Sequence, residues 1–164
     1  MAHSVEMRYI CGMNKIDLKH LAGYQQDFAL WSAEQASLIR SGTLNKVDLE
    51  NVAEEIESVG NSERYEIDSR MEILLQHLLK WQFQPAKRKN GWKGSIVEQR
   101  IRIARVIKRS PSLHNYPAEN LEGSFVIGRN AAVTDTQLPE ATFPETCPYT
   151  IEQILDPDFL PGGN

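Results

Sequence analysis

Residues 48–85 read DLENVAEEIESVGNSERYEIDSRMEILLQHLLKWQFQP, and their pattern decides the fold class. Apolar residues recur at three- and four-residue steps throughout this stretch, which is the spacing that keeps them on one face of an α-helix. Asp48 is a good N-cap for a first helix, and Gly60 is suited to end it. A second helix is predicted from Asn61 to the residue before Pro85, because proline cannot continue a helix.

The apolar positions of these two helices mark the sides that we expect to be buried. The first helix is expected to bury Leu49, Val52, Ala53, Ile56 and Val59. The main stripe of the second helix consists of Ile67, Met71, Leu74, Leu75, Leu78 and Leu79. At a rise of about 1.5 Å per residue the second helix would be about 34 Å long, so we expect it to be the central helix of the domain.

Three further helices are predicted outside this stretch. One carries an apolar stripe that begins at Leu21 and ends before Gly42. Another starts at Ser95, which follows a basic loop and forms a capping-box pattern with Glu98. The last starts near Pro117, since proline is favoured in the first turn of a helix. The sequence therefore predicts an all-α fold, a compact helical bundle of about five helices.

The chain has 164 residues, the size of one ordinary domain. We expect a flexible segment over 1–16, a single helical domain over 17–164, and a Pro-rich C-terminal arm over 136–164 that packs on the helices. Hydrophobic residues at 41% exclude a disordered or collagen-like protein. No apolar run approaches the roughly 20 residues that span a bilayer, and the N-terminus is a poor secretory signal, so we expect a cytoplasmic protein without a membrane partner.

Charge is strongly segregated along the chain. Residues 48–72 contain nine acidic residues and two basic ones, whereas residues 80–109 contain ten basic residues and one acidic one. The two segments pair within the fold, pair between two chains, or leave the basic segment facing an external partner. Pairing of the two segments is favoured over an external polyanion, but the sequence does not choose between pairing within one chain and pairing between two.

The helix that starts at Ser95 is expected to be apolar over a broad arc. This arc consists of Ile96, Val97, Ile101, Ile103, Ala104 and Ile107. Arg100 falls within it and would need a buried partner. The natural candidates are three glutamates that share one flank of the first helix in 48–85, namely Glu50, Glu54 and Glu57. The other two interpretations of this flank are a solvated surface and, less favoured, a divalent metal site.

The basic segment is the strongest candidate for a binding surface. Four cations of the loop surround one tryptophan, and three arginines form the expected solvent stripe of the next helix. These residues are Lys87, Arg88, Lys89, Trp92, Lys93, Arg102, Arg105 and Arg109. Cations beside an exposed aromatic ring suit phosphate contact and base stacking.

The opposing interpretation is that Glu98 and Arg102 form an ordinary surface pair and Trp92 packs into the core. A pI of about 5.6 also argues against a dedicated nucleic-acid binder. We therefore expect an interaction module that uses its basic 86–109 surface to bind a protein or polyanion partner. Self-association is a further possibility, and nucleic acid is possible but not favoured.

An enzyme is the alternative. Glu54, Glu57 and His77 would have to converge in a cleft, where they could serve a small enzyme or a metal-dependent hydrolase. The di-iron pattern needs a His three residues after a Glu, and no Glu of this chain has one. We accordingly expect no cofactor and assign no metal ligand.

Four strings together resemble a known family: YQQDFALW at 24–31, the stretch 47–85, SPSL at 110–113, and FPETCPYTIEQILDPDFLP at 143–161. The family is bacterial and is catalogued as domain of unknown function number twenty-nine. The resemblance covers nearly the whole chain. It implies a compact all-helical single domain, with no assigned activity, no established cofactor and no agreed catalytic residues.

Overall fold

The computed structural model describes residues 21–162, which form helices and connecting turns without any strand. The predicted all-α fold is therefore confirmed. The chain divides into two compact units, Met1–Glu57 and Ser58–Asn164, and the division falls inside a helix rather than in a linker. A single domain over 17–164 stays a prediction, and the segment 1–16 lies outside the described residues.

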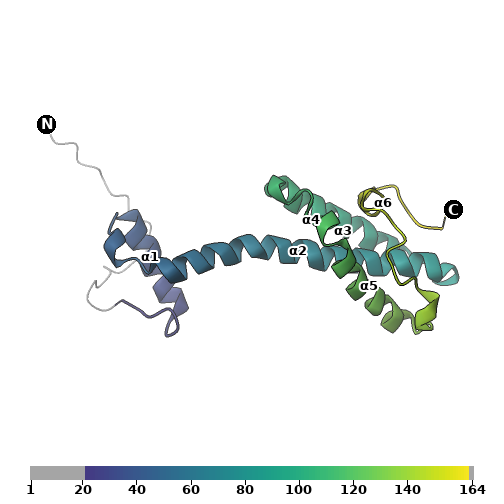
Figure 1. Ribbon diagram of the computed structural model, residues 1–164, viewed down its shortest axis with the longest axis horizontal. Coiled ribbons are helices and arrows are strands. Elements are labelled where there is room, and N and C mark those ends of the chain that lie inside the picture. The colour runs from purple at the N-terminus through teal and green to yellow at the C-terminus, as the bar shows by residue number, and fades with distance from the viewer. Residues whose placement is uncertain (1–20, 163–164) are drawn as a thin grey trace. The chain divides into compact units, whose positions relative to one another are not determined.

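Six α-helices follow one another along the described residues (Figure 1). They are α1 (Phe28–Arg40), α2 (Leu49–Phe83), α3 (Asn90–Arg109), α4 (Tyr116–Glu119), α5 (Leu121–Thr136) and α6 (Ile151–Leu155). Short 3-10 turns lie between them: η1 (Leu44–Lys46), η2 (Pro85–Lys87), η3 (Pro111–Leu113) and η4 (Glu140–Thr142). Within 21–162, none of the helices is long and apolar enough to cross a membrane.

Helix α2 is continuous where two helices were predicted. The expected break at Gly60 is wrong, because this glycine keeps a helical backbone; among the described glycines a positive φ occurs at Gly42 and Gly162. An interior glycine costs a helix about 1 kcal/mol, which is less than the cost of nucleating a new helix after a break. The other end was predicted correctly, since α2 stops just before Pro85.

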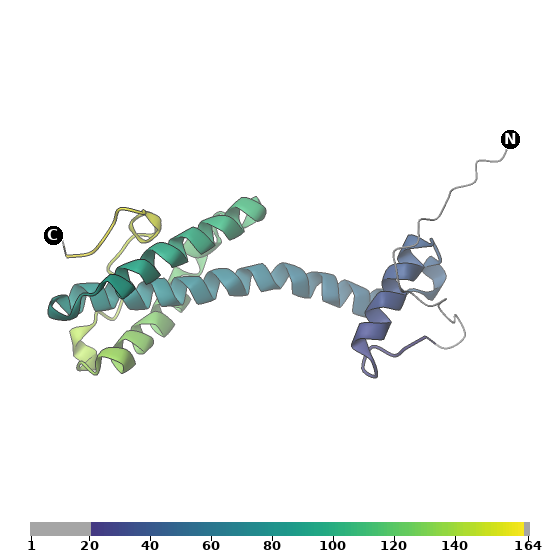
Figure 2. The same cartoon turned by 180° about the vertical axis from the view of Figure 1, so that it is seen from behind.

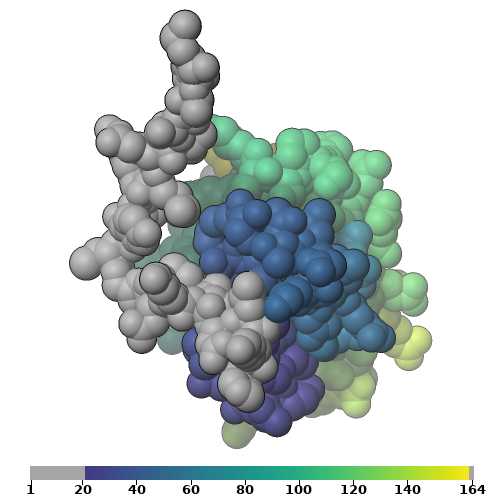
Figure 3. Space-filling model, turned by 90° about the vertical axis from the view of Figure 1, so that its left-hand side faces the viewer, coloured from purple at the N-terminus to yellow at the C-terminus, as the bar shows by residue number. Residues whose placement is uncertain are grey.

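The first unit packs α1 against the start of α2, and its surface faces the viewer in purple and blue in Figure 3. Trp31 is buried between them, and its indole N–H donates to the Asp48 carboxylate at 3.3 Å. Asp48 also accepts from the backbone N–H of Asn51, which makes it the N-cap of α2, as predicted. The Tyr24 ring packs edge-on against Trp31, and its hydroxyl donates to Glu55.

Most of the apolar stripe predicted for residues 49–59 is exposed, although Val52 is half-buried. Leu49 is 67% exposed and Ile56 is 68% exposed, and Val59 is similarly exposed. The prediction failed because α1 covers the neighbouring flank of the helix, where Asp48, Asn51 and Glu55 make their hydrogen bonds. Periodicity shows that a helix has an apolar face, but it does not show that anything covers that face.

The second unit is built around the C-terminal half of α2, and its predicted leucine stripe is buried in full. Helices α3 and α5 lie beside this half of α2 in both views (Figure 1 and Figure 2). The core comprises Ile67, Met71, Leu74, Leu75, Leu78 and Leu79 of α2 together with Ile96, Ile103, Val106, Phe125, Ala132, Phe143, Tyr149 and Ile154. Each such aliphatic or aromatic side chain contributes roughly 1.5–3 kcal/mol when it is removed from water.

Helix α3 begins five residues earlier than predicted. Its first residue is Asn90, so Ser95 lies inside the helix and the predicted capping box with Glu98 is wrong. Glu98 pairs with Arg102 one turn later instead. The early start has a physical reason, since it carries the Trp92 side chain into a buried position against α2, where Lys80 lies over the indole ring.

Arg100 anchors the C-terminal arm instead of pairing with the acidic flank of α2. Its buried guanidinium donates to backbone carbonyls of the arm, at 2.7 Å to Ile154, 2.9 Å to Phe159 and 3.3 Å to Pro157. The predicted carboxylate partner is therefore wrong. The carbonyl oxygens of the C-terminal arm accept the hydrogen bonds of the planar guanidinium and take the place of the expected carboxylate.

Gly128 sets the distance between α5 and α2. A Cβ at this position would lie 2.7 Å from the carbonyl oxygen of Glu72 and 3.0 Å from the Cβ of Leu75. Because the nearest atom belongs to helix backbone, it has no side-chain freedom with which to move away. We expect Gly128→Ala to lower the free energy of unfolding by about 1–3 kcal/mol, measured by urea denaturation.

Gly60→Ala is the matched control for this substitution. Nothing lies within 4 Å of the position where its Cβ would be, and α2 is helical there. We expect this variant to gain up to about 1 kcal/mol, because alanine has the higher helix propensity. Equal effects of the two substitutions would contradict the close approach of α5 and α2.

We expect Arg100→Lys to loosen the arm. Lysine keeps the charge, but it lacks the planar guanidinium that donates to the carbonyls of Gln153, Ile154, Pro157 and Phe159, so the loss should be about 2–3 kcal/mol. Hydrogen exchange should accelerate in residues 149–160 first, while the exposed-site control Arg102→Lys leaves it unchanged. Unaltered protection of the arm in the Arg100 variant would show that other contacts hold it.

Candidate functional site

The outward side of α3 exposes apolar residues that were predicted to be buried. Val97 is 41% exposed and Ile101 is 48% exposed, and Ala104 is exposed beside them. At 100° per residue these three positions form one row along the helix. Only the opposite side of α3 faces the core, through residues such as Ile103. The broad apolar arc therefore splits into a buried half and an exposed half.

Three cations are mixed with this exposed apolar row. Lys93, Arg105 and Lys108 are exposed, and no ion pair or hydrogen bond within residues 21–162 involves their side chains. Together the six positions cover an arc of about 120°. We call this surface the basic face; it consists of Lys93, Val97, Ile101, Ala104, Arg105 and Lys108.

Lys108 was missing from the predicted binding residues. In helical projection it lies between Val97 and Ile101, inside the arc that was expected to be buried. Lysine is almost never fully buried without a partner, so its presence in that arc was a signal that this side of the helix meets solvent.

Two of the predicted binding arginines have acidic partners within the fold. Arg102 pairs with Glu98 at 2.7 Å. Arg109 donates to Glu63 at 2.6 Å and lies 3.6 Å from Glu66, and the Ser110 hydroxyl also donates to Glu63. The basic and acidic segments of the chain therefore pair with each other at the end of α3. This pairing does not involve the residues of the basic face.

The loop cations are held by aromatic rings. The Arg88 guanidinium lies 5.0 Å from the centre of the Trp81 ring and donates to the Trp81 carbonyl. Lys89 lies 5.7 Å from the centre of the Trp92 ring. Trp92 is only 7% exposed, so the exposed aromatic ring that was expected for base stacking is not present at this position. Lys87 is exposed in η2, three residues before α3 begins, and is not part of that helix.

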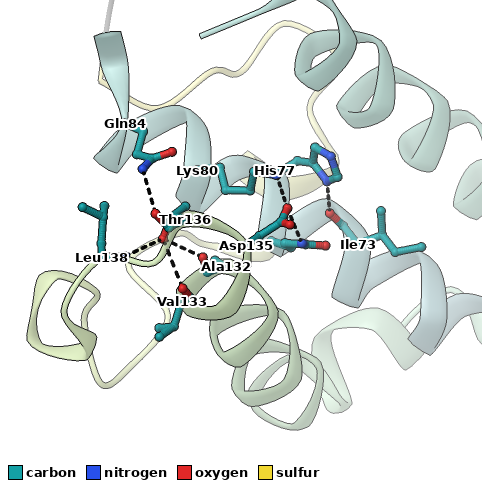
Figure 4. Close-up of polar contacts among 10 residues, drawn as sticks. Ile73, His77, Lys80, Gln84, Ala132, Val133, Asp135, Thr136 and Leu138 are labelled. Atoms are coloured by element: carbon teal, nitrogen blue, oxygen red, sulfur yellow. Dashed lines mark hydrogen bonds and ion pairs between the residues drawn. The ribbon is translucent and has the colours of Figure 1, made fainter. Parts of the chain in front are cut away.

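His77 lies in a polar cluster between α2 and α5 (Figure 4). Its Nδ1 atom is 2.9 Å from the carbonyl oxygen of Ile73, which can only accept, so Nδ1 carries the proton and Nε2 keeps a lone pair. Burial lowers the pKa of His77, which keeps the imidazole neutral at neutral pH. Beside it, the Lys80 ammonium pairs with Asp135, to which Gln76 also donates.

The three catalytic candidates have different surroundings. Glu54 and Glu57 are exposed on the first unit and make no hydrogen bond or ion pair with any of residues 21–162, whereas His77 belongs to the second unit. In the described part of the chain, no group of three or more His, Cys, Asp and Glu residues is arranged to hold a metal ion. An enzyme built on Glu54, Glu57 and His77 stays a prediction from the sequence.

A second exposed surface occurs on the first turns of α2. Leu49, Ala53 and Ile56 are exposed there, and the three glutamates of the predicted flank lie beside them. We call it the acidic face; it consists of Leu49, Glu50, Ala53, Glu54, Ile56 and Glu57. All six positions belong to the first unit and cover an arc of about 160°.

The ion pair of Lys80 and Asp135 makes stability depend on pH. The Lys80 ammonium donates to Asp135 and holds the pKa of that carboxyl below its usual range, about 3.9 in an unfolded chain. A carboxyl whose pKa is lower in the folded state stabilises fully above the unfolded pKa, and this stabilisation is lost as the pH falls through the folded pKa.

We therefore expect Asp135→Asn to destabilise the fold near neutral pH, because the buried Lys80 loses its carboxylate. Half of the Asp135 side chain is exposed and solvent screens the pair, so the cost should be only about 1 kcal/mol. The difference between wild type and variant should shrink below about pH 4, when followed by urea denaturation across a pH series. Glu122→Gln removes an exposed carboxylate that has no ion pair within residues 21–162, and it should differ little from wild type. A pH-independent cost of Asp135→Asn would contradict the assignment.

The described part of the chain is similar to one known protein family. The family described as Domain of unknown function DUF29 matches residues 23–160, which include all six helices and both exposed faces. No match was found among the curated proteins or among the solved structures. Since the family match spans most of the chain, this protein is a member of the DUF29 family.

Proposed function

We propose that the chain is an interaction module and that the basic face of α3 binds an acidic amphipathic helix of a protein partner. Val97 and Ile101 would pack against apolar residues of the partner helix. The cations at the edges of the row, Lys93 and Arg105 among them, would pair with its carboxylates. This is the helix-against-helix mode in which apolar anchors at helical spacing supply contact area and flanking charges select the partner.

The single observation that carries this proposal is the combination of exposed apolar side chains and unpaired cations on one side of α3. Val97 and Ile101 leave 41% and 48% of their surfaces in water. An exposed apolar row bordered by polar residues is the usual mark of an association surface. The neighbouring cations have no acidic partner within residues 21–162, so their pairing capacity is unused.

A protein partner is favoured over nucleic acid. Phosphate contact needs cations, but it gives no reason for an aliphatic row at the centre of the surface. Single-strand binding would need exposed aromatic rings beside the cations, but Trp92 is buried and the basic face carries no aromatic residue.

The test uses fluorescence anisotropy with a labelled synthetic helix that carries Leu and Ile along one side and Glu on both flanks. Two further labelled ligands are compared with it. One is a peptide of the same composition whose apolar residues are spread around the helix, and the other is a single-stranded oligonucleotide. We expect the amphipathic peptide to bind best. Reversing two cations with Arg105→Glu and Lys108→Glu should weaken its binding about tenfold or more.

The matched control reverses two exposed cations outside the basic face, Arg40→Glu and Lys87→Glu. It changes the net charge by the same amount and should bind the peptide as wild type does. If the control loses as much affinity as the α3 variant, only net charge matters and the basic face is not the site. Preferential binding of the oligonucleotide would replace the protein partner with nucleic acid.

A further inference from the structure

The basic face and the acidic face have matching compositions. Each presents three apolar positions and three charges of one sign on a single side of a helix. The basic face offers Val97, Ile101 and Ala104 with its cations, and the acidic face offers Leu49, Ala53 and Ile56 with its glutamates. One chain therefore carries both a surface for an acidic amphipathic helix and an acidic amphipathic helix.

From this match we propose that the partner of the basic face is a second copy of the same chain. The acidic face of α2 in one copy docks on the basic face of α3 in another. This inference rests on the proposed function, because it names the occupant of the same surface. Leu49 and Ile56 pack against Val97 and Ile101, and Glu50, Glu54 and Glu57 approach the three cations.

Repulsion within the acidic face supports a cationic partner. Glu50, Glu54 and Glu57 are three and four residues apart, and like charges at this spacing repel one another and destabilise a helix. No cation within residues 21–162 forms an ion pair with them. Docking on the basic face would convert this repulsion into attraction between chains.

The size of the two faces predicts how strong the association is. The acidic face spans about 12 Å of helix and the basic face about 22 Å. A stable interface usually involves about 20–30 residues on each side, and each of these faces supplies six, so one contact alone is weak. We therefore expect fast, concentration-dependent association that weakens strongly with added salt, because its charges stay near water.

A charge-swap experiment with sedimentation velocity tests the proposal on the full chain. One variant reverses the basic face with Arg105→Glu and Lys108→Glu. A second variant reverses the acidic face with Glu50→Lys and Glu57→Lys. We expect wild type to self-associate at low salt and each variant alone to associate about tenfold or more weakly. An equimolar mixture of the two variants should recover association, since each now complements the other.

The control variant is Glu122→Lys with Glu145→Lys. Both residues are exposed, neither has an ion pair within the described residues, and neither lies on either face. It matches the charge change of the acidic-face variant and should associate like wild type. Circular dichroism of each variant, which should match that of wild type, separates a lost interface from a lost fold.

Three outcomes would overturn the inference: a wild-type chain that stays monomeric at low salt, variants that associate as wild type does, or a mixture that does not recover. The synthetic peptide distinguishes this failure from failure of the proposed function. If the basic face binds that peptide and the chain does not self-associate, the function stands and its partner is another protein. If the peptide does not bind either, both fail.

Discussion

Burial of the α2 leucine stripe is the constraint on which the second unit depends. Leu74, Leu75 and Leu78 are fully buried, and they can be so only if elements cover more than one side of the helix. Helix α3 and helix α5 provide that cover, with α5 brought close by Gly128 against the backbone of Glu72. The C-terminal arm completes the core with Phe143, Tyr149 and Ile154.

Helix α3 is used on both of its sides. Its inner side contributes Ile96, Ile103 and Val106 to the core, while its outer side keeps Val97 and Ile101 in solvent. A helix whose inner side is held by a core presents its outer side on a rigid backbone, which limits the entropy lost when a partner binds. Arg100 adds to this rigidity, because its guanidinium ties the arm to the same helix. This arrangement suits a binding surface.

Several features could be predicted from sequence because they depend on local chemistry. Asp48 was expected to cap α2 and does so, because its short carboxylate reaches the N–H of Asn51. The leucine stripe from Ile67 to Leu79 was expected to be buried and is buried, because six large apolar side chains on one side of a helix gain free energy when they leave water. The stop before Pro85 follows from the missing N–H of proline.

The features that were missed depend on what lies opposite each side chain. Gly60 was expected to end a helix, but α2 continues through it, because one interior glycine costs less free energy than nucleating a new helix. Arg100 was expected to pair with a carboxylate, but it donates hydrogen bonds to backbone carbonyls of residues 153–159. The sequence around Arg100 does not indicate where those residues lie in the fold. For the candidate surface, the sequence predicted Lys93 and Arg105 correctly as exposed cations but assigned Val97 and Ile101 to the core.

The sequence by itself determined the all-α class, the helix ends set by Pro85 and Gly42, and the buried leucine stripe, because all of these follow from backbone chemistry and helical period. Only the tertiary structure decided which half of each apolar arc is buried. A period of 3.6 residues says which residues share a side of a helix. Whether that side meets another helix or water depends on residues far away in the chain, and this decision is what leaves the basic face and the acidic face exposed.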